Sequence, residues 1–81
     1  MNNVKQKKLE VKYWGVNFWS QLTFTDTKGN YFVSENHIDW NKTNDSEKRK
    51  IVNNLMYCGK DPDDDPRGYL ENAEISLVDS F

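Results

Sequence analysis

Residues 20–33 constrain the fold more than any other part of the sequence. Leu22 and Phe24 alternate with polar neighbours, which is the period of a half-buried strand over about residues 20–25. The pentapeptide DTKGN follows at residues 26–30, where an aspartate opens a turn and a glycine supplies the left-handed backbone that closes it. The apolar run YFV then returns at residues 31–33. The segment therefore predicts an antiparallel hairpin.

A strand before this hairpin is predicted to bend. Leu9, Val11 and Tyr13 alternate with charged residues, but the apolar pattern changes phase at Trp14 and Gly15. Glycine accepts backbone angles that other residues resist, so a phase change at a glycine favours a bulge or a bend. The pattern also predicts that Tyr13 and Trp14 lie on opposite faces of the strand.

One helix is predicted over residues 45–58. Asn44 and Glu47 have the spacing of an N-cap and its reciprocal partner. Two other starts also fit the sequence: Thr43 with Ser46, or Asp45 alone. Apolar residues recur at helical spacing over 51–56, and Gly59 has the place of the left-handed residue that ends many helices.

A last short strand is predicted at residues 73–79, where Ala73, Ile75 and Leu77 alternate with polar residues. The order β-β-β-α-β indicates the α+β class, with a small antiparallel sheet of three to four strands and one helix packed on one face. At 81 residues the chain is expected to form a single small domain over 1–81, with residues 1–7 flexible.

The aromatic content points to a binding role. Only 36% of the residues are hydrophobic and 30% are charged, yet the chain carries three Trp, four Tyr and four Phe. Each ring can bury on the order of 150–250 Å². Because so many rings exceed what a small interior can enclose, we expect some of them on an exposed apolar patch that a partner or a second copy covers.

The sequence favours a cytoplasmic protein. Cys58 is the only cysteine, which excludes an internal disulfide, and the first residues have no apolar run of the kind that a secretory signal requires. No stretch approaches the roughly 18–20 apolar residues that cross a bilayer. We therefore expect no membrane association.

The acidic segment DPDDD at residues 61–65 allows three interpretations. Asp61, Asp63 and Asp65 match the first ligands of an EF-hand calcium loop, but Pro66 stands where that loop needs a glycine. The aspartates could instead compete for basic groups of a nucleic-acid-binding protein, or keep a connecting loop in water. A net charge of −2 is too small for a broad imitation of a duplex.

Charge is unevenly distributed along the chain. Residues 1–50 carry nine Lys or Arg and six Asp or Glu, a net +3, whereas residues 51–81 carry two and seven, a net −5. The basic residues precede several rings, as in a stacking platform for single-stranded nucleic acid. They are Lys5, Lys7, Lys8 and Lys12. Nucleic-acid binding is not expected, because the pI near 5.3 opposes it and no known nucleic-acid motif is present.

Catalytic signatures are weak, so we predict that the chain is not an enzyme and uses no cofactor and no metal. His37 is the only histidine, and its formal pairing with Cys58 or Asp39 lacks further support. Cys58 follows the apolar stripe of the predicted helix, so a core position is expected for it.

Our leading hypothesis is a non-enzymatic protein-binding module that can self-associate as a homo-oligomer and that prefers a partner with a basic surface. The chain is short, compact and rich in Asn and Lys, and in this it resembles accessory proteins of bacteriophages and mobile elements. An inhibitor of a host defence or nucleic-acid-processing protein is the specific form of this hypothesis. The alternative is a carboxylate metal-binding or nucleic-acid-binding regulatory protein. The expected partner-binding residues are Trp14, Phe18, Trp19, Trp40, Asp61, Asp63, Asp64 and Asp65.

Overall fold

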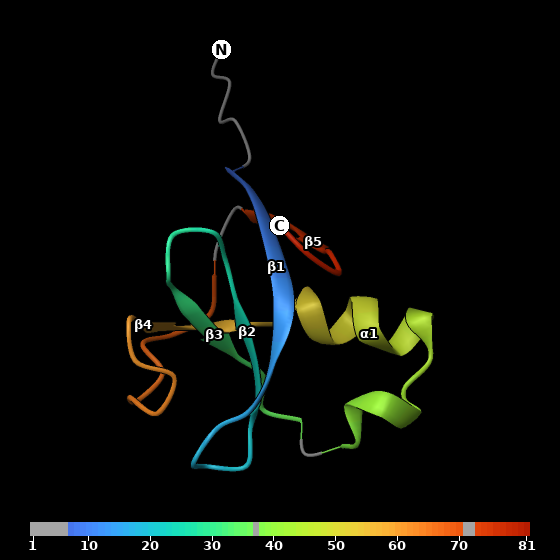
Figure 1. The fold of residues 1–81 in the computed structure, drawn as a ribbon, viewed down its shortest axis with the longest axis horizontal. Helices are drawn as coiled ribbons and strands as arrows, with labels where there is room; N and C mark the ends of the chain where they lie inside the picture. Colours follow the sequence, from blue (N-terminus) through green and yellow to red (C-terminus); the bar gives the residue numbers. More distant parts are fainter. Residues whose placement is uncertain (1–6, 37, 71–72) are drawn as a thin grey trace.

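The computed structural model describes residues 7–36, 38–70 and 73–81. Figure 1 shows how the elements of these residues are arranged. They are β1 (Lys7–Val16), β2 (Leu22–Thr25), β3 (Tyr31–Val33), the 3₁₀ helix η1 (Trp40–Lys42), α1 (Asp45–Val52), β4 (Met56–Gly59) and β5 (Ala73–Leu77). Residues 1–6, predicted to be flexible together with Lys7, lie outside the described part, and Lys7 begins β1.

The five strands of the described residues form one curled sheet in the order β4-β3-β2-β1-β5. Neighbours pair antiparallel except β1 and β5, which run parallel. The α+β class is therefore confirmed, but the prediction of a purely antiparallel sheet of three to four strands is wrong. The strand that the sequence did not predict is β4, whose first three residues fall within the predicted helix. The parallel pair arises because the chain crosses over before β5.

The predicted hairpin is present, with Thr25 paired to Tyr31 across the turn. Asp26 closes this turn, because its Oδ1 atom accepts hydrogen bonds from the backbone N–H groups of Lys28 and Asn30, both at 2.9 Å. Its Oδ2 atom accepts a third from the Asn30 amide at 2.9 Å. Gly29 has the positive φ of 80° that the turn requires.

The predicted irregularity in the first strand is also confirmed. Tyr13 pairs with Phe24 and Gly15 pairs with Thr23, so Trp14 is the extra residue of a bulge. Gly15 has φ 146°, which few other residues adopt. The bulge separates the two neighbouring rings, because Tyr13 packs against the core and Trp14 is exposed.

Helix α1 begins as predicted, because the side chain of Asn44 accepts a hydrogen bond from the Glu47 N–H at 2.9 Å. It ends at Val52, six residues before the predicted end. Asn53 caps it, and the Asn54 amide donates to the Lys50 carbonyl at 3.1 Å, which satisfies one terminal acceptor of the helix. Asparagine competes in this way with the helical backbone, and the chain turns into β4.

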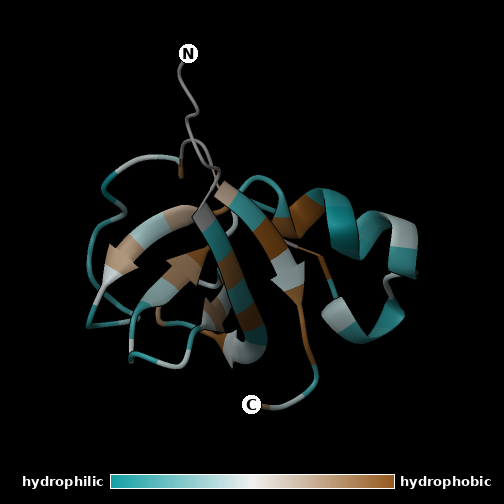
Figure 2. Cartoon of the chain, turned by 90° about the horizontal axis from the view of Figure 1, so that it is seen from above, coloured by the Kyte–Doolittle hydropathy of each residue, from teal (hydrophilic) through white to brown (hydrophobic). Residues whose placement is uncertain are grey.

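Side chains of the sheet form two buried clusters. The larger one lies between the sheet and the helical segment, and in Figure 2 the hydrophobic part of α1 is the end nearest the sheet. It consists of Val11, Leu22, Phe24, Phe32, Trp40, Ile51, Val52 and Leu55. The smaller cluster consists of Val33, Met56 and Cys58, with Tyr31 packed against it. Cys58 is therefore a core residue as predicted, but it belongs to a strand.

In the described residues, no helix has both the length and the apolar character that crossing a membrane would require.

Candidate functional site

A tight turn after β1 presents two aromatic rings to solvent. Asn17 organises it, because its Oδ1 atom accepts hydrogen bonds from the backbone N–H groups of Trp19 at 3.0 Å and Gln21 at 2.9 Å. Its backbone N–H also donates to the Gln21 carbonyl at 3.1 Å. Asn17 is buried, while Phe18 and Trp19 remain 83% and 54% exposed. The two rings meet edge to face, with centroids 5.9 Å apart.

The acidic loop that follows β4 folds over the smaller buried cluster. The Cys58 thiol lies 2.9 Å from the carbonyl oxygen of Asp64 and 3.3 Å from that of Asp61. The side chain of Asp61 in turn accepts a hydrogen bond from the Asp63 N–H at 2.9 Å. The loop is thus held by its backbone carbonyls and by the Asp61 side chain, and its aspartates remain exposed.

Burial, followed by the negative charges of Asp64 and Asp61, raises the pKa of the Cys58 thiol above its usual value. The thiol therefore stays protonated at neutral pH and serves as a hydrogen-bond donor to the loop. A buried protonated thiol is a poor nucleophile. His37, which the sequence offered as its partner, lies outside the described residues.

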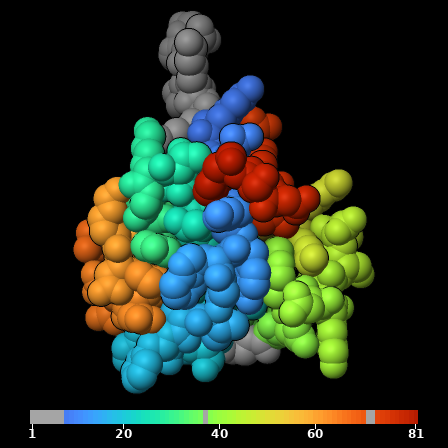
Figure 3. Space-filling model, viewed as in Figure 1, coloured from blue at the N-terminus to red at the C-terminus, as the bar shows by residue number. Residues whose placement is uncertain are grey.

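The turn and the acidic loop, more than 40 residues apart in sequence, are joined by three hydrogen bonds. The Phe18 N–H donates to the carboxylate of Asp63 at 2.7 Å, and the Trp19 indole N–H donates to the Asp63 carbonyl at 2.8 Å. The Asn17 amide donates to the Pro62 carbonyl at 2.9 Å. Figure 3 shows the orange atoms of the loop beside the blue atoms that end β1.

We call the combined feature the aromatic–acidic surface. Its members are Phe18, Trp19, Asp61, Asp63, Asp64 and Asp65, all exposed. The sequence predicted each half as a binding element, and the structure brings the halves together. Asp64 has an ion-pair partner in Arg67 at 3.4 Å. Among the described residues, no salt bridge is formed by Asp61, Asp63 or Asp65.

Trp14 and Trp40, which the sequence grouped with these rings, lie elsewhere. Trp14 is 46% exposed and packs edge to face on Tyr31, at 5.6 Å between centroids, on the side of the sheet that carries Cys58. Trp40 is 7% exposed and stacks on Tyr13 at 5.0 Å, so it is a core residue. Trp40 was expected among the partner-binding residues, but η1 places its ring against Tyr13 and Phe24 in the larger buried cluster.

The described carboxylates do not converge on one point. No group of three or more His, Cys, Asp or Glu side chains there could hold a metal ion. Asp61, Asp63 and Asp64 instead accept hydrogen bonds from neighbouring backbone N–H groups. The acidic segment is therefore a folded connecting loop whose aspartate side chains are exposed.

The basic residues of β1 are distant from the aromatic–acidic surface. Lys8 is near the start of the strand and Phe18 follows its end, so about 30 Å of extended chain separates them. Lys12 instead lies over the Phe81 ring, 5.4 Å from its centroid. Lys5 and the side chain of Lys7 are outside the described part. Of the described lysines, Lys8 and Lys12 therefore show no joint stacking platform with Phe18 and Trp19.

Sequence reasoning missed the two residues that assemble the surface. Asn17 could have been identified, since an asparagine directly after a strand is a frequent turn former. Cys58 gave no such signal, because its role depends on a loop that returns over β4. No known family model, curated protein or solved structure matches the chain.

Proposed function

We propose that the chain is a non-enzymatic protein-binding module whose contact surface is the aromatic–acidic surface. One observation carries this proposal. Asp63 accepts hydrogen bonds from both the Phe18 backbone and the Trp19 indole, so the Trp19 ring and the backbone that carries the Phe18 ring are fixed beside a group of aspartates. An isolated exposed ring needs no explanation, but an exposed indole anchored by a specific hydrogen bond, with a second ring packed edge to face on it, suits recognition.

The fixed geometry lowers the cost of binding. Immobilising a side chain on association costs about 0.5–1.5 kcal/mol, and the contacts to Asp63 restrict this turn before a partner arrives. Tryptophan is also among the residues that most often dominate interface energies. Phe18 and Trp19 would therefore supply the apolar anchor.

The aspartates would select the partner by charge. Asp61, Asp63 and Asp65 belong to the loop that is bonded to the Phe18 turn through Asp63, and they form no salt bridge in the described structure. Complementary charge accelerates encounter and excludes partners of the wrong sign more than it adds affinity. The complementary partner is a protein with an apolar pocket bordered by Lys or Arg.

A partner of this kind is common among proteins that handle nucleic acids, whose binding grooves are basic. The form of the proposal that follows is an inhibitor, encoded by a phage or mobile element, of a host defence or nucleic-acid-processing protein. Self-association through the same rings is the competing use of the surface. No specific observation favours the metal-binding or nucleic-acid-binding alternative.

The test compares two exposed phenylalanines. Tagged wild-type protein, Phe18→Ala and the control Phe81→Ala are used to capture partners from a bacterial lysate, and light scattering gives the mass of each alone. Phe18 has no described contact beyond the neighbouring Trp19 ring and its backbone bond, so its truncation should leave the fold intact. We expect the captured protein to be lost with Phe18→Ala only.

Asp63→Asn separates charge from geometry, because the amide retains an oxygen that can accept the Phe18 N–H. The variant should bind the captured partner more slowly, with a weaker dependence on salt, while its circular dichroism stays unchanged. Identical capture by all variants, or a wild-type dimer that Phe18→Ala dissociates, would contradict the proposed partner-binding role.

A further inference from the structure

The exposed indole of Trp19 has no basic group over it among the described residues, although other rings of the chain do. Lys48 lies 5.0 Å from the centroid of the Trp40 ring, and Arg67 lies 6.0 Å from that of Tyr57. A cation over a ring is attracted by the negative face of the π system, and tryptophan attracts it most strongly. Trp19 is 54% exposed, so much of its ring is accessible to a ligand.

A carboxylate is held beside this indole. The Trp19 Nε1–H group donates to the Asp63 carbonyl at 2.8 Å, and the Asp63 Oδ1 atom accepts from the Phe18 N–H at 2.7 Å. The Asp63 Oδ2 atom accepts no hydrogen bond from the described residues, and the side chain forms no salt bridge with them. The two hydrogen bonds together fix the carboxylate relative to the ring, and its second oxygen stays open to a donor.

We propose that this site binds an arginine side chain of the partner protein, with the guanidinium stacked on the Trp19 ring and hydrogen-bonded to the Asp63 carboxylate. The inference rests on the proposed function and names the group that its contact surface recognises. A guanidinium is planar, so it can lie flat on an indole while its forked N–H donors bond a neighbouring carboxylate. Hydrogen bonds between charged groups are also about twice as strong as neutral ones.

Arginine suits the site better than lysine. The lysine ammonium is a compact and strongly hydrated point charge, which neither stacks on a ring nor offers a fixed fork of donors. The stem of an arginine also needs apolar surface. Phe18 supplies it, because its ring is 83% exposed and packs edge to face on Trp19 with centroids 5.9 Å apart.

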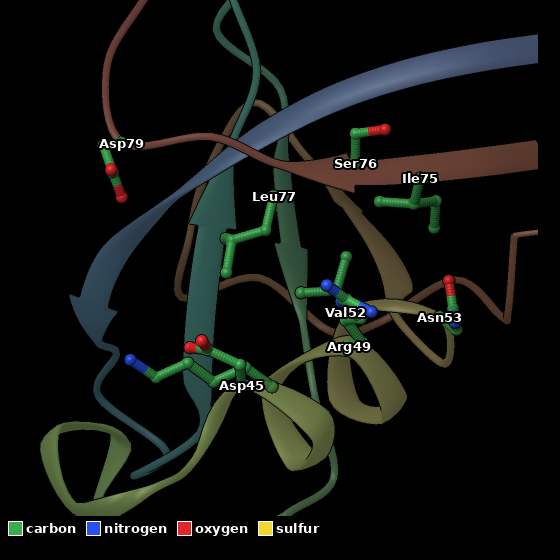
Figure 4. A pocket seen from close by; sticks show the side chains of 9 residues that line it. Asp45, Arg49, Val52, Asn53, Ile75, Ser76, Leu77 and Asp79 are labelled. Carbon is green, nitrogen blue, oxygen red and sulfur yellow. The ribbon is translucent and has the colours of Figure 1, made fainter.

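The chain also has a pair of aspartates that lack a ring beside them. Asp45 and Asp79 line a cleft of about 450 Å³ between α1 and β5, and Figure 4 shows them with Arg49 in the same cleft. No aromatic residue lines it among those described. A second arginine would meet a cation there and no stacking surface, so the backbone amides of Asp45 and Asp79 serve as internal controls.

The test uses three peptides that differ at one position: acetyl-Leu-Gly-Arg-Gly-Leu-amide and the same peptide with lysine or with citrulline, the neutral analogue of arginine. Nitrogen-15-labelled wild-type protein is titrated with each at physiological salt, which screens distant charges. We expect the arginine peptide to shift the Trp19 indole N–H signal saturably and to bind about fivefold more tightly than the citrulline peptide, with the lysine peptide between them. The Trp14 indole signal and the amides of Asp45 and Asp79 should stay unchanged.

Two variants distinguish a direct contact from general electrostatics. Asp63→Asn removes the charge beside the ring but keeps an oxygen that can accept the Phe18 N–H. It should reduce the preference for arginine over citrulline to about twofold or less. Asp65→Asn removes the same charge from the same loop, where Asp65 has no described hydrogen bond to the Phe18 turn. This matched control should keep the full preference.

The inference is overturned by a lysine peptide that binds as tightly as the arginine peptide, or by equal losses of preference in the two aspartate variants. Shifts confined to the cleft between α1 and β5, or no Trp19 shift at millimolar peptide, would overturn it as well. These results leave the proposed function standing, because that proposal fails on a different result, the retention of the captured partner by Phe18→Ala.

Discussion

The two edge strands of the sheet differ in whether another backbone segment covers them. β4 is covered by the chain that follows it: the Tyr57 N–H donates to the Gly68 carbonyl at 2.9 Å, and the Tyr57 carbonyl accepts from the Arg67 N–H at 2.8 Å. The Leu70 N–H bonds the Leu55 carbonyl at 3.2 Å. β5 has no such cover in the described residues. A protected edge prevents unwanted pairing, whereas the outer backbone groups of β5 have no strand partner among the described residues.

This difference gives the acidic segment a structural role. The chain between β4 and residue 70 first folds over Cys58 and the Phe18 turn, then returns along the β4 edge. The same connection thus closes one edge and builds the aromatic–acidic surface. Substitutions near β4 should therefore disturb both the cover of the β4 edge and the aromatic–acidic surface, whereas substitutions near β5 should disturb neither.

The largest effect is expected from truncating the core beside the closed edge. Leu55→Ala should lower the free energy of unfolding by about 2–5 kcal/mol, because the side chain is 1% exposed. Leu77→Ala, beside the open edge, should cost less because Leu77 is only half buried. Urea denaturation of both variants checks the order, and equal losses would show that the two edges are equally supported.

A smaller effect is expected from Cys58→Ala, which removes the thiol that anchors the acidic loop. Leaving the Asp64 carbonyl without its donor should cost about 1–3 kcal/mol. Hydrogen exchange should accelerate at residues 61–65 and at Phe18, but not along β5. Unchanged exchange in the loop would mean that its other hydrogen bonds suffice.

The same thiol should influence stability at alkaline pH. The pKa of Cys58 is raised in the folded state, so its contribution is full below the unfolded pKa of about 8.5 and is lost as pH rises from there through the folded pKa. Wild-type stability should fall in that range, and Cys58→Ala should show a shallower decline. Parallel alkaline curves would contradict the assigned pKa direction.

Asp26 provides a reference in the β2–β3 turn, outside the two edge strands. Burial alone would raise its pKa, but hydrogen bonds from Asn30 and Lys28 and the charge of Lys60 outweigh burial, so the pKa lies below its usual value. Its contribution is full above the unfolded pKa of about 4 and is lost as pH falls through the folded pKa.

Asp26→Asn should therefore lower the free energy of unfolding by about 1 kcal/mol at pH 7. The loss should shrink progressively below about pH 4. Thermal unfolding across this pH range measures the difference. A difference between wild type and variant that does not vary with pH would mean that the Asp26 charge is not responsible.

The smallest effect is expected from Arg67→Ala. The Arg67–Asp64 pair is exposed, and such pairs contribute about 0–1 kcal/mol. The cover of β4 uses the Arg67 backbone, which alanine preserves. Lys50→Ala, which breaks the exposed Lys50–Glu47 pair of α1, is the matched control. A loss well above that of the control would assign part of the edge cover to the Arg67 side chain.

Local features were predictable from sequence, and the site was predictable only in halves. The hairpin around Asp26, the bulge at Gly15 and the Asn44 cap depend on residues within a few positions of one another. The exposed rings and the aspartates were each recognised, but their contact through Asp63 bridges more than 40 residues. The spacing of Leu55 and Met56 matched a helix equally well, and so β4 was missed.

By itself, the amino-acid sequence determined the turns, the caps, the alternation of strand residues and the excess of aromatic side chains. Tertiary structure decided that Trp40 is enclosed while Trp14 and Trp19 are exposed, that Cys58 holds the acidic loop, and that β4 is covered while β5 is open. The physical reason is the range of the interactions. Backbone preferences and periodicity act between near neighbours, whereas burial and strand pairing depend on segments that meet only in the folded chain.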